Sequence, residues 1–136
     1  MNIHQLFHTL HQLSRNLTNE LNEVLKSHGL YSAQWAVIFV LHSKGVLTQK
    51  ELCHYLSVEA PPMTRTIQRL LKQGFVKQTQ GFDKRKKLIQ LTDEALKQYP
   101  IWESSVKTLN QSLLKGLPSN DQEELFQILK RWENSL

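Results

Sequence analysis

Residues 48–92 read TQKELCHYLSVEAPPMTRTIQRLLKQGFVKQTQGFDKRKKLIQLT, and this stretch predicts two short helices joined by a tight turn. Thr48 and Glu51 have the spacing of a capping box, in which each side chain satisfies a backbone amide of the other residue. A second helix is expected over residues 60–73, and the apolar residues of one face recur at helical spacing: Met63, Ile67, Leu70 and Leu71. With only residues 57–59 between them, the two helices predict a helix-turn-helix.

Two prolines stand at the start of the second helix. Pro61 and Pro62 fit a first helical turn, because the amides there have no partner within the helix and the fixed φ of proline suits a helix start. Gly74 is expected to end this helix in a left-handed conformation.

A β-hairpin is expected directly after the second helix. Residues 75–80 and 87–92 read as short strands, and residues 81–86 form a loop too long for a two-residue turn. A hairpin in this position is the wing of a winged helix-turn-helix. The expected fold class is therefore mainly α with a small β-hairpin wing.

The positive charge of the chain is concentrated on this unit. Residues 44–92 contain ten Lys and Arg against three Asp and Glu, a net charge of +7, whereas the remainder has seven against nine. A run of charge is often only a solvated face. Here the excess lies on a helix-turn-helix and its loop, which favours a polyanionic partner.

These residues resemble the MarR family of winged-helix repressors over essentially the whole chain. The matching segments are LTQKEL at 47–52, MTRTI at 63–67, Leu70 with GFV at 74–76, and the wing residues Asp83 and Arg85 followed by IQLT at 89–92. The chain departs from the family pattern at three places: Phe82 replaces a common second acid, Ala95 replaces a frequent glycine, and Pro61-Pro62 is unusual. The resemblance implies a DNA-binding dimer with a pocket, commonly for aromatic acids, between its dimerisation helices and the winged unit.

Length and composition describe one ordinary domain. A chain of 136 residues with 40% hydrophobic and 21% charged residues is long enough to bury a core. One cysteine cannot form an internal disulfide, and neither a membrane-length apolar run nor a signal-peptide core is present, so we expect a cytoplasmic protein.

Long amphipathic helices are expected at both ends. Residues 3–26 carry an apolar stripe, a helix should follow from Ser32 as N-cap to about Ser43, and Ser119 and Gln122 have capping-box spacing at the start of the last helix. Pro100 should kink the preceding helix or begin a new segment. The stripes exceed what one small unit can cover. Residues 1–30 and 93–136 are therefore assigned as dimerisation helices around a winged unit at 31–92, although both ends could instead pack on their own domain.

The polar face of the second helix suits base edges in the major groove. Arg65 could bind guanine, Gln68 adenine, and Thr64, Pro61 or Pro62 thymine methyl groups. Arg69, Lys72 and Thr48 are expected at phosphates.

The wing loop should contact the minor groove. Arg85 is the expected groove residue, with Asp83 holding its guanidinium, while Lys84, Lys86 and Lys87 neutralise phosphates. A plain salt bridge within the loop is the simpler reading of the Asp83–Arg85 pair.

Sensing residues are less clearly marked. Tyr31, Trp35, His42 and Trp102 are candidate walls of an effector pocket, although core packing explains each more simply.

His4, His8 and His11 share a helical face that could bind a divalent metal, but a polar stripe is the default and no metal or other cofactor is assigned. Cys53 is expected to be a buried, inert thiol.

No enzyme motif is found, since the sequence has neither a glycine-rich phosphate loop, nor a carboxylate pair in a recognisable motif, nor a nucleophile motif. The alternatives to a sequence-specific regulator are a winged-helix module that binds an acidic protein and a non-specific architectural DNA binder. A protein-docking face should show exposed apolar residues on the second helix, where this chain has polar ones.

Overall fold

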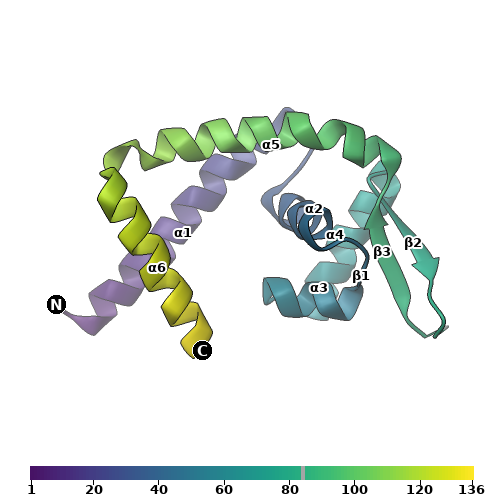
Figure 1. Cartoon of the computed structure of the whole chain (residues 1–136), viewed down its shortest axis with the longest axis horizontal. Coiled ribbons are helices and arrows are strands. Elements are labelled where there is room, and N and C mark those ends of the chain that lie inside the picture. Colours follow the sequence, from purple (N-terminus) through teal and green to yellow (C-terminus); the bar gives the residue numbers. More distant parts are fainter. Residues whose placement is uncertain (84) are drawn as a thin grey trace.

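A computed structural model describes residues 1–83 and 85–136, and it contains a small head and two long helices that extend from it (Figure 1). The elements are α1 Ile3–Lys26, α2 Ser32–Lys44, β1 Leu47–Thr48, α3 Gln49–Leu56, α4 Ala60–Gln73, β2 Val76–Gln80, β3 Lys87–Leu91, α5 Asp93–Leu113, the 3₁₀ turn η1 Leu114–Gly116 and α6 Ser119–Ser135. The expected class is confirmed: the structure is mainly helical, with a hairpin wing after a helix-turn-helix.

The helix-turn-helix forms as its local sequence predicts. Glu51 N donates to Thr48 Oγ1 over 3.1 Å, and Thr48 N donates to Glu51 Oε1 over 3.0 Å, so the capping box is present. Both prolines lie in the first turn of α4, and Gly74 ends α4 with a φ of 79°. Met63, Ile67 and Leu70 are buried, while Leu71 is only half-buried.

The sheet contains a strand that the sequence did not predict. Its order is β1-β3-β2, with Leu47 opposite Ile89 and Val76 opposite Leu91 in antiparallel registers. Two residues are too few to show the alternation by which a strand is recognised, so β1 is defined only by its partner β3. It connects the end of α2 to the base of the wing.

Three expectations about helix boundaries need correction. Helix α2 begins with Tyr31, not Ser32, at the N-cap. Helix α5 runs through Pro100, so of the two expected effects of this proline only the new segment is wrong; Pro100 is exposed, and water can hydrate the carbonyl that loses its amide partner. The Ser119–Gln122 capping box does not form, because the N-cap of α6 is Pro118 and not Ser119; Gln122 Nε2 donates to the carbonyls of Leu117 and Leu114.

One hydrophobic core fills the head. It includes buried residues of α2, α3, α4 and the sheet, and it extends to Leu25 at the end of α1 and to Val106 in α5. Trp102, only 2% exposed, packs edge to face on Phe75 with ring centroids 4.8 Å apart. Helices α1 and α6 contribute little to this core, because Leu25 is the only buried residue of α1 and α6 has none.

No helix in the part of the chain that the structure describes combines the length and the apolar character needed to cross a membrane.

Candidate nucleic-acid interface

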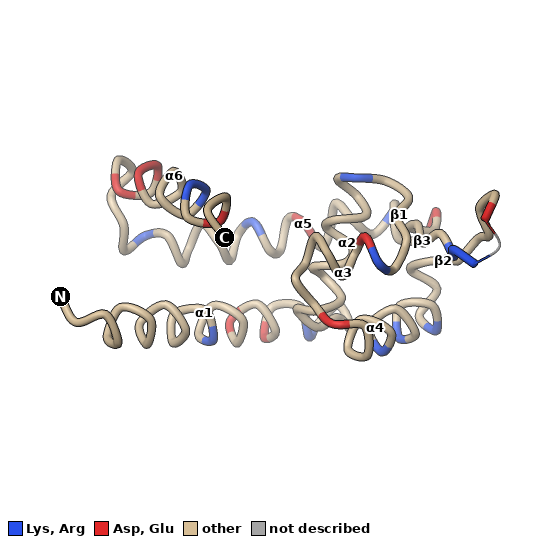
Figure 2. The backbone as a smooth tube through the Cα atoms, turned by 90° about the horizontal axis from the view of Figure 1, so that it is seen from below, with Lys and Arg blue, Asp and Glu red and all other residues tan. Residues whose placement is uncertain are grey.

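Helix α4 presents a polar face away from the core. Pro61, Arg65, Gln68 and Lys72 are exposed on it, opposite the buried Met63, Ile67 and Leu70. Figure 2 shows the cationic residues of α4 along one edge of the molecule. The set expected from sequence is therefore largely brought together on one surface.

Pro62 and Thr64 are only half-buried members of this face. The Thr64 hydroxyl accepts a 2.7 Å hydrogen bond from Nε2 of Gln49, the first residue of α3. A hydroxyl that accepts one bond can still donate its own hydrogen, so Thr64 keeps a donor for a ligand. Sequence reasoning missed Gln49, and its only signal was its position directly after the capping residue Thr48.

The start of α3 is held rigidly beside α4. Hydrogen bonds from the Thr48 backbone and hydroxyl hold the pKa of the Glu51 carboxyl below its ordinary value, with a smaller contribution from the charge of Lys86. The ionised carboxylate is therefore the form that the capping box favours.

The wing loop is organised by an acid, in a different way from the one expected. Asp83 Oδ1 accepts from the backbone amide of Arg85 over 3.0 Å, whereas the expectation placed the guanidinium there. Among the described residues, the ion pair within 4.0 Å is Lys130–Glu133 on α6, not Asp83–Arg85. The short loop places the Arg85 amide nearest to the carboxylate, so the Arg85 side chain stays exposed. The expected Lys84 contact lies outside the described residues.

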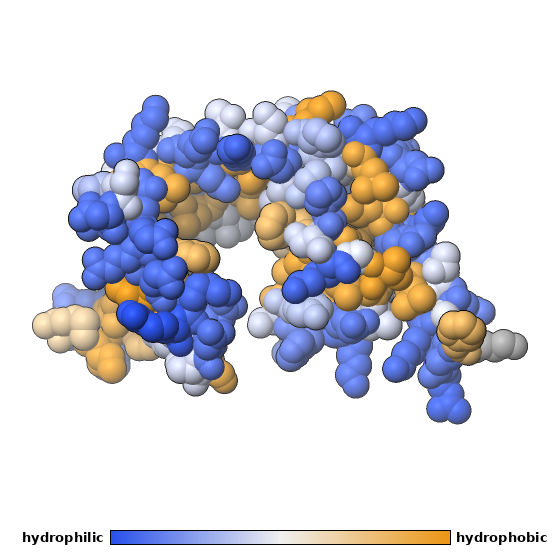
Figure 3. All heavy atoms as spheres, viewed as in Figure 1, coloured by the Kyte–Doolittle hydropathy of each residue, from blue (hydrophilic) through white to orange (hydrophobic). Residues whose placement is uncertain are grey.

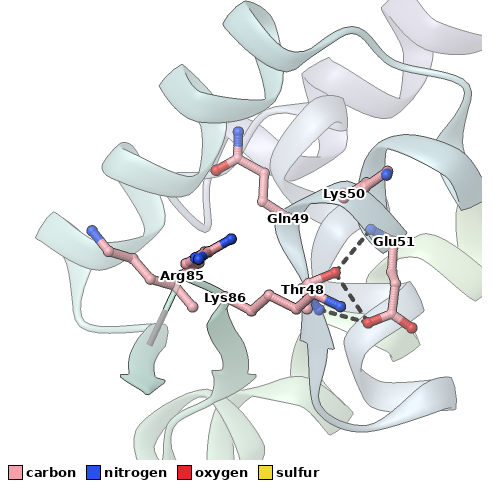
Figure 4. Close-up of a pocket in the computed structure, with 7 residues that line it drawn as sticks. Thr48, Gln49, Lys50, Glu51, Arg85 and Lys86 are labelled. Atoms are coloured by element: carbon pink, nitrogen blue, oxygen red, sulfur yellow. Dashed lines mark hydrogen bonds between the residues drawn. The ribbon is translucent and has the colours of Figure 1, made fainter. Parts of the chain in front are cut away.

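A concave surface of about 490 Å³ lies between the wing and the start of α3. It is lined by Thr48, Gln49, Lys50, Glu51, Arg85, Lys86 and Lys87. Figure 4 shows the Arg85 and Lys86 side chains on one side of it and the Thr48–Glu51 hydrogen bonds on the other. Four cations against one carboxylate make this surface suited to phosphate groups.

Comparison with known proteins gives the same assignment as the geometry. The MarR family profile matches residues 30–87. The uncharacterized HTH-type transcriptional regulator YwoH of Bacillus subtilis (strain 168) is 43% identical over 127 residues, which cover 92% of this chain and 91% of that protein. This chain belongs to the MarR family. It is accordingly a winged helix transcriptional regulator, not an enzyme.

Solved structures support the family fold. A mutant MarR from E. coli complexed with operator DNA is 28% identical, with a TM-score of 0.86 over 93% of this chain and 92% of that one. The apo form of wild-type E. coli MarR, also 28% identical, gives a TM-score of 0.79 over 96% of each chain. Both the DNA-bound and the DNA-free structures thus share the fold of this MarR-family protein.

The four candidate effector residues of the MarR-family protein do not form one pocket. Trp35 lines a concave surface of about 460 Å³ between α2 and α5, together with Phe39 and Val106. Trp102 belongs to the core, and His42 stacks on Tyr99 with ring centroids 3.6 Å apart. Tyr31 is exposed at the start of α2, where the Arg69 guanidinium lies 5.8 Å from its ring centroid.

The other candidate sensing residues are placed as follows. His4, His8 and His11 are exposed on α1, and His4 and His8 line a shallow surface hollow. In the described part of the chain, no three His, Cys, Asp or Glu side chains are grouped closely enough to hold a metal ion. Cys53 is half-buried in α3 and packs against the core.

Proposed function

We propose that this MarR-family regulator binds double-stranded DNA in a sequence-specific manner, as a homodimer on a pseudo-palindromic operator, and represses transcription. The observation that carries the proposal is the position of the exposed polar face of α4 beside a concave surface with four cations, three at the wing and one in α3. A related structure that is 28% identical binds operator DNA, which supports the same use of this surface.

Residues in the first half of α4 are proposed to contact the bases. Arg65 is proposed to bind guanine O6 and N7 together, and Gln68 to pair with adenine. The Thr64 methyl group and the rings of Pro61 and Pro62 are proposed to contact thymine methyl groups, while the Thr64 hydroxyl, bonded to Gln49, keeps its hydrogen for a donor contact.

The residues proposed to contact phosphates lie on both sides of the base-contacting residues of α4. Thr48, Lys86 and Lys87 line the concave surface, and Lys72 is exposed further along α4. Arg69 can also reach a phosphate, because a guanidinium that lies over the Tyr31 ring keeps its N–H edge free. Lys84, whose placement is not described, stays a predicted phosphate contact from sequence alone.

Arg85 is proposed to enter the minor groove next to the site of α4. Its side chain is exposed and points into the concave surface, and Asp83 fixes the backbone from which it projects (Figure 4). A narrow A·T minor groove attracts such a cation by its negative potential.

The dimer is proposed from apolar residues that the single chain leaves exposed. Helix α1 exposes Ile3, Leu13 and Leu17, and α6 exposes Phe126 and Leu129. The space-filling view of Figure 3 shows such apolar residues at the surface of the lobe that α1 and α6 form. Phe7 and Trp132 join the two helices edge to face, with ring centroids 5.8 Å apart. A partner chain would cover this surface and place two winged units, 31–92 in each chain, on one duplex.

We further propose that a small aromatic effector releases the DNA. The concave surface between α2 and α5 is the proposed place for it, since Trp35 and Phe39 offer ring faces there, beside one cation, Lys107, and one carboxylate, Glu103. A regulator that binds duplex DNA would act in the cytoplasm.

Selection of bound sites from a random pool of duplexes tests the proposal. A pseudo-palindrome with two half-sites about one helical turn apart is the expected result. Binding without any enriched sequence would replace the proposal with an architectural DNA binder. Failure to retain any duplex, combined with capture of an acidic protein, would replace it with a docking module.

A further inference from the structure

Helix α4 is attached to the segment that connects α1 with α2, and two glutamines make the attachment. Nε2 of Gln73, in the last turn of α4, donates to the carbonyl of Gly29 over 2.8 Å. Its Oε1 accepts from Nε2 of Gln34, on α2, over 2.6 Å. Oε1 of Gln34 in turn accepts from the Tyr31 amide over 2.8 Å. Four groups from three parts of the chain are thus joined in one line.

Gln34 is the buried member of this line of hydrogen bonds, whereas Gln73 lies at the surface. Gln34 is 3% exposed and is the buried polar side chain of the core region. No buried side-chain nitrogen or oxygen of the described residues lacks a partner. A buried amide costs free energy unless it is bonded, so this pair tolerates only a narrow range of positions.

Two further contacts hold the same connecting segment. The Arg69 guanidinium lies over the Tyr31 ring, and Arg69 precedes Gln73 by four residues, on the same side of α4. On the other side of the segment, the Ser32 amide donates to Oδ1 of Asn22 in α1 over 2.7 Å. The connecting segment is therefore bonded to α1 at one end and to α4 at the other.

Stability alone does not require this arrangement. Replacing both partners of a buried hydrogen bond with apolar groups of similar shape is often close to neutral, whereas removing one partner is costly. Hydrogen bonds between amides are directional, whereas apolar contacts are not. The Gln34–Gln73 bond therefore forms at only one relative placement of α2 and α4.

We propose that Gln34 and Gln73 are positioning residues that fix helix α4 relative to α1, and so set the separation of the two recognition helices in the dimer. The inference rests on the proposed function, since it assumes a dimer that reads two half-sites. Neither glutamine touches DNA in this account; both act through the direction of α4.

The test uses the full-length protein with both glutamines replaced, Gln34→Leu with Gln73→Leu. A second variant, Gln73→Met, keeps the experiment decisive if the double variant does not fold, because Gln73 is exposed and its replacement removes no core side chain; its cost is the lost partner of Gln34 Nε2, which the melting temperature measures. Gln90→Leu is the control: Gln90 is a half-buried glutamine of β3 outside the proposed interface and outside the line of hydrogen bonds.

Each protein is titrated by fluorescence anisotropy against the selected operator and against the same half-sites with one base pair inserted or removed between them. We expect the parent protein and Gln90→Leu to prefer the best spacing by about tenfold or more, because each added step shifts a half-site by about 3.4 Å and rotates it. The double variant and Gln73→Met should prefer the best spacing by less than about threefold. Both should keep the parent's affinity for a single half-site.

A role in stability alone would lower the melting temperature and leave the spacing preference unchanged, and that result would overturn the inference. Equal loss of affinity at every spacing would overturn it as well. Failure of the proposed function looks different, because the parent protein would then show no preferred spacing at all.

Discussion

Gln49 and Thr64 are joined by a 2.7 Å hydrogen bond from the Gln49 amide nitrogen to the Thr64 hydroxyl, so the first residue of α3 is bonded directly to the recognition helix. The bond fixes the hydroxyl and leaves its hydrogen free to donate toward DNA. We therefore predict that Gln49 acts on base recognition through Thr64.

Removing this bond should weaken operator binding without unfolding the protein. We expect Gln49→Leu and Thr64→Val each to lower affinity by about 3- to 10-fold, the equivalent of one ordinary hydrogen bond. The double variant should be little worse than either single one, because both remove the same interaction. Anisotropy titrations of the four proteins measure this coupling, and strictly additive losses would show that Gln49 does not act through Thr64.

Arg85 should matter more than its neighbours in the wing. Arg85→Ala is expected to reduce operator affinity by about tenfold or more, chiefly at sites with an A·T-rich flank, because a narrow minor groove is where its charge is best placed. Lys86→Ala should instead weaken all duplexes alike and lower the salt slope by about 1, as expected for a phosphate contact.

Competition binding on duplexes with A·T and G·C flanks separates the two wing effects. Circular dichroism of both variants controls for the fold. If Arg85→Ala stays within about twofold of the parent on every duplex, the minor-groove role is refuted.

The capping box at α3 should show a defined pH dependence. The pKa of Glu51 is lowered in the folded protein, so its contribution to stability is present above the ordinary value of 4.5 and is lost as the pH falls through the folded value. Thr48→Ala removes the hydroxyl that caps α3 and should cost about 1 kcal/mol of unfolding free energy.

Carbon-detected NMR titration of the Glu51 carboxyl checks the sign. Its pKa should rise in Thr48→Ala, since the hydroxyl contribution to the shift is removed while the backbone contribution remains. Thr108→Ala, at an exposed position of α5, is the matched control. An unchanged pKa in Thr48→Ala would mean that the hydroxyl does not bind the carboxylate in solution.

The exposed faces of α1 and α6 should form the dimer. We expect Leu17→Glu combined with Phe126→Glu to give a monomer, because two buried carboxylates per chain would cost far more than the apolar contacts they replace. Val46→Glu introduces one such carboxylate at an exposed apolar position of the head and should remain dimeric. Sedimentation velocity at micromolar concentration distinguishes these outcomes, and a monomeric parent protein would refute the dimer.

Local sequence signals were sufficient for the helix-turn-helix. Thr48 and Glu51 mark the start of α3, and Gly74 marks the end of α4, because each acts on backbone groups within a few residues of itself. The polar face of α4 followed from the same periodicity that buries Met63 and Ile67.

Features that depend on distant parts of the chain could not be found in this way. Strand β1 exists only because Leu47 lies opposite Ile89, and the Gln34–Gln73 pair joins residues 39 positions apart. Gln122 was expected to form a capping box with Ser119, but α6 has its N-cap at Pro118, and Gln122 instead donates to the carbonyls of Leu114 and Leu117. Asp83 likewise binds the nearest amide and not the guanidinium assigned to it.

The central claim is that the cationic head binds duplex DNA through phosphate contacts made by α4 and the wing. The dissociation constant for duplex DNA, measured by anisotropy over a series of salt concentrations, tests it most directly. We predict a linear fall of log affinity with log salt, with a slope corresponding to about six or more released counterions for a dimer. An affinity that does not change with salt, or no binding to duplex DNA at low ionic strength, would contradict the account.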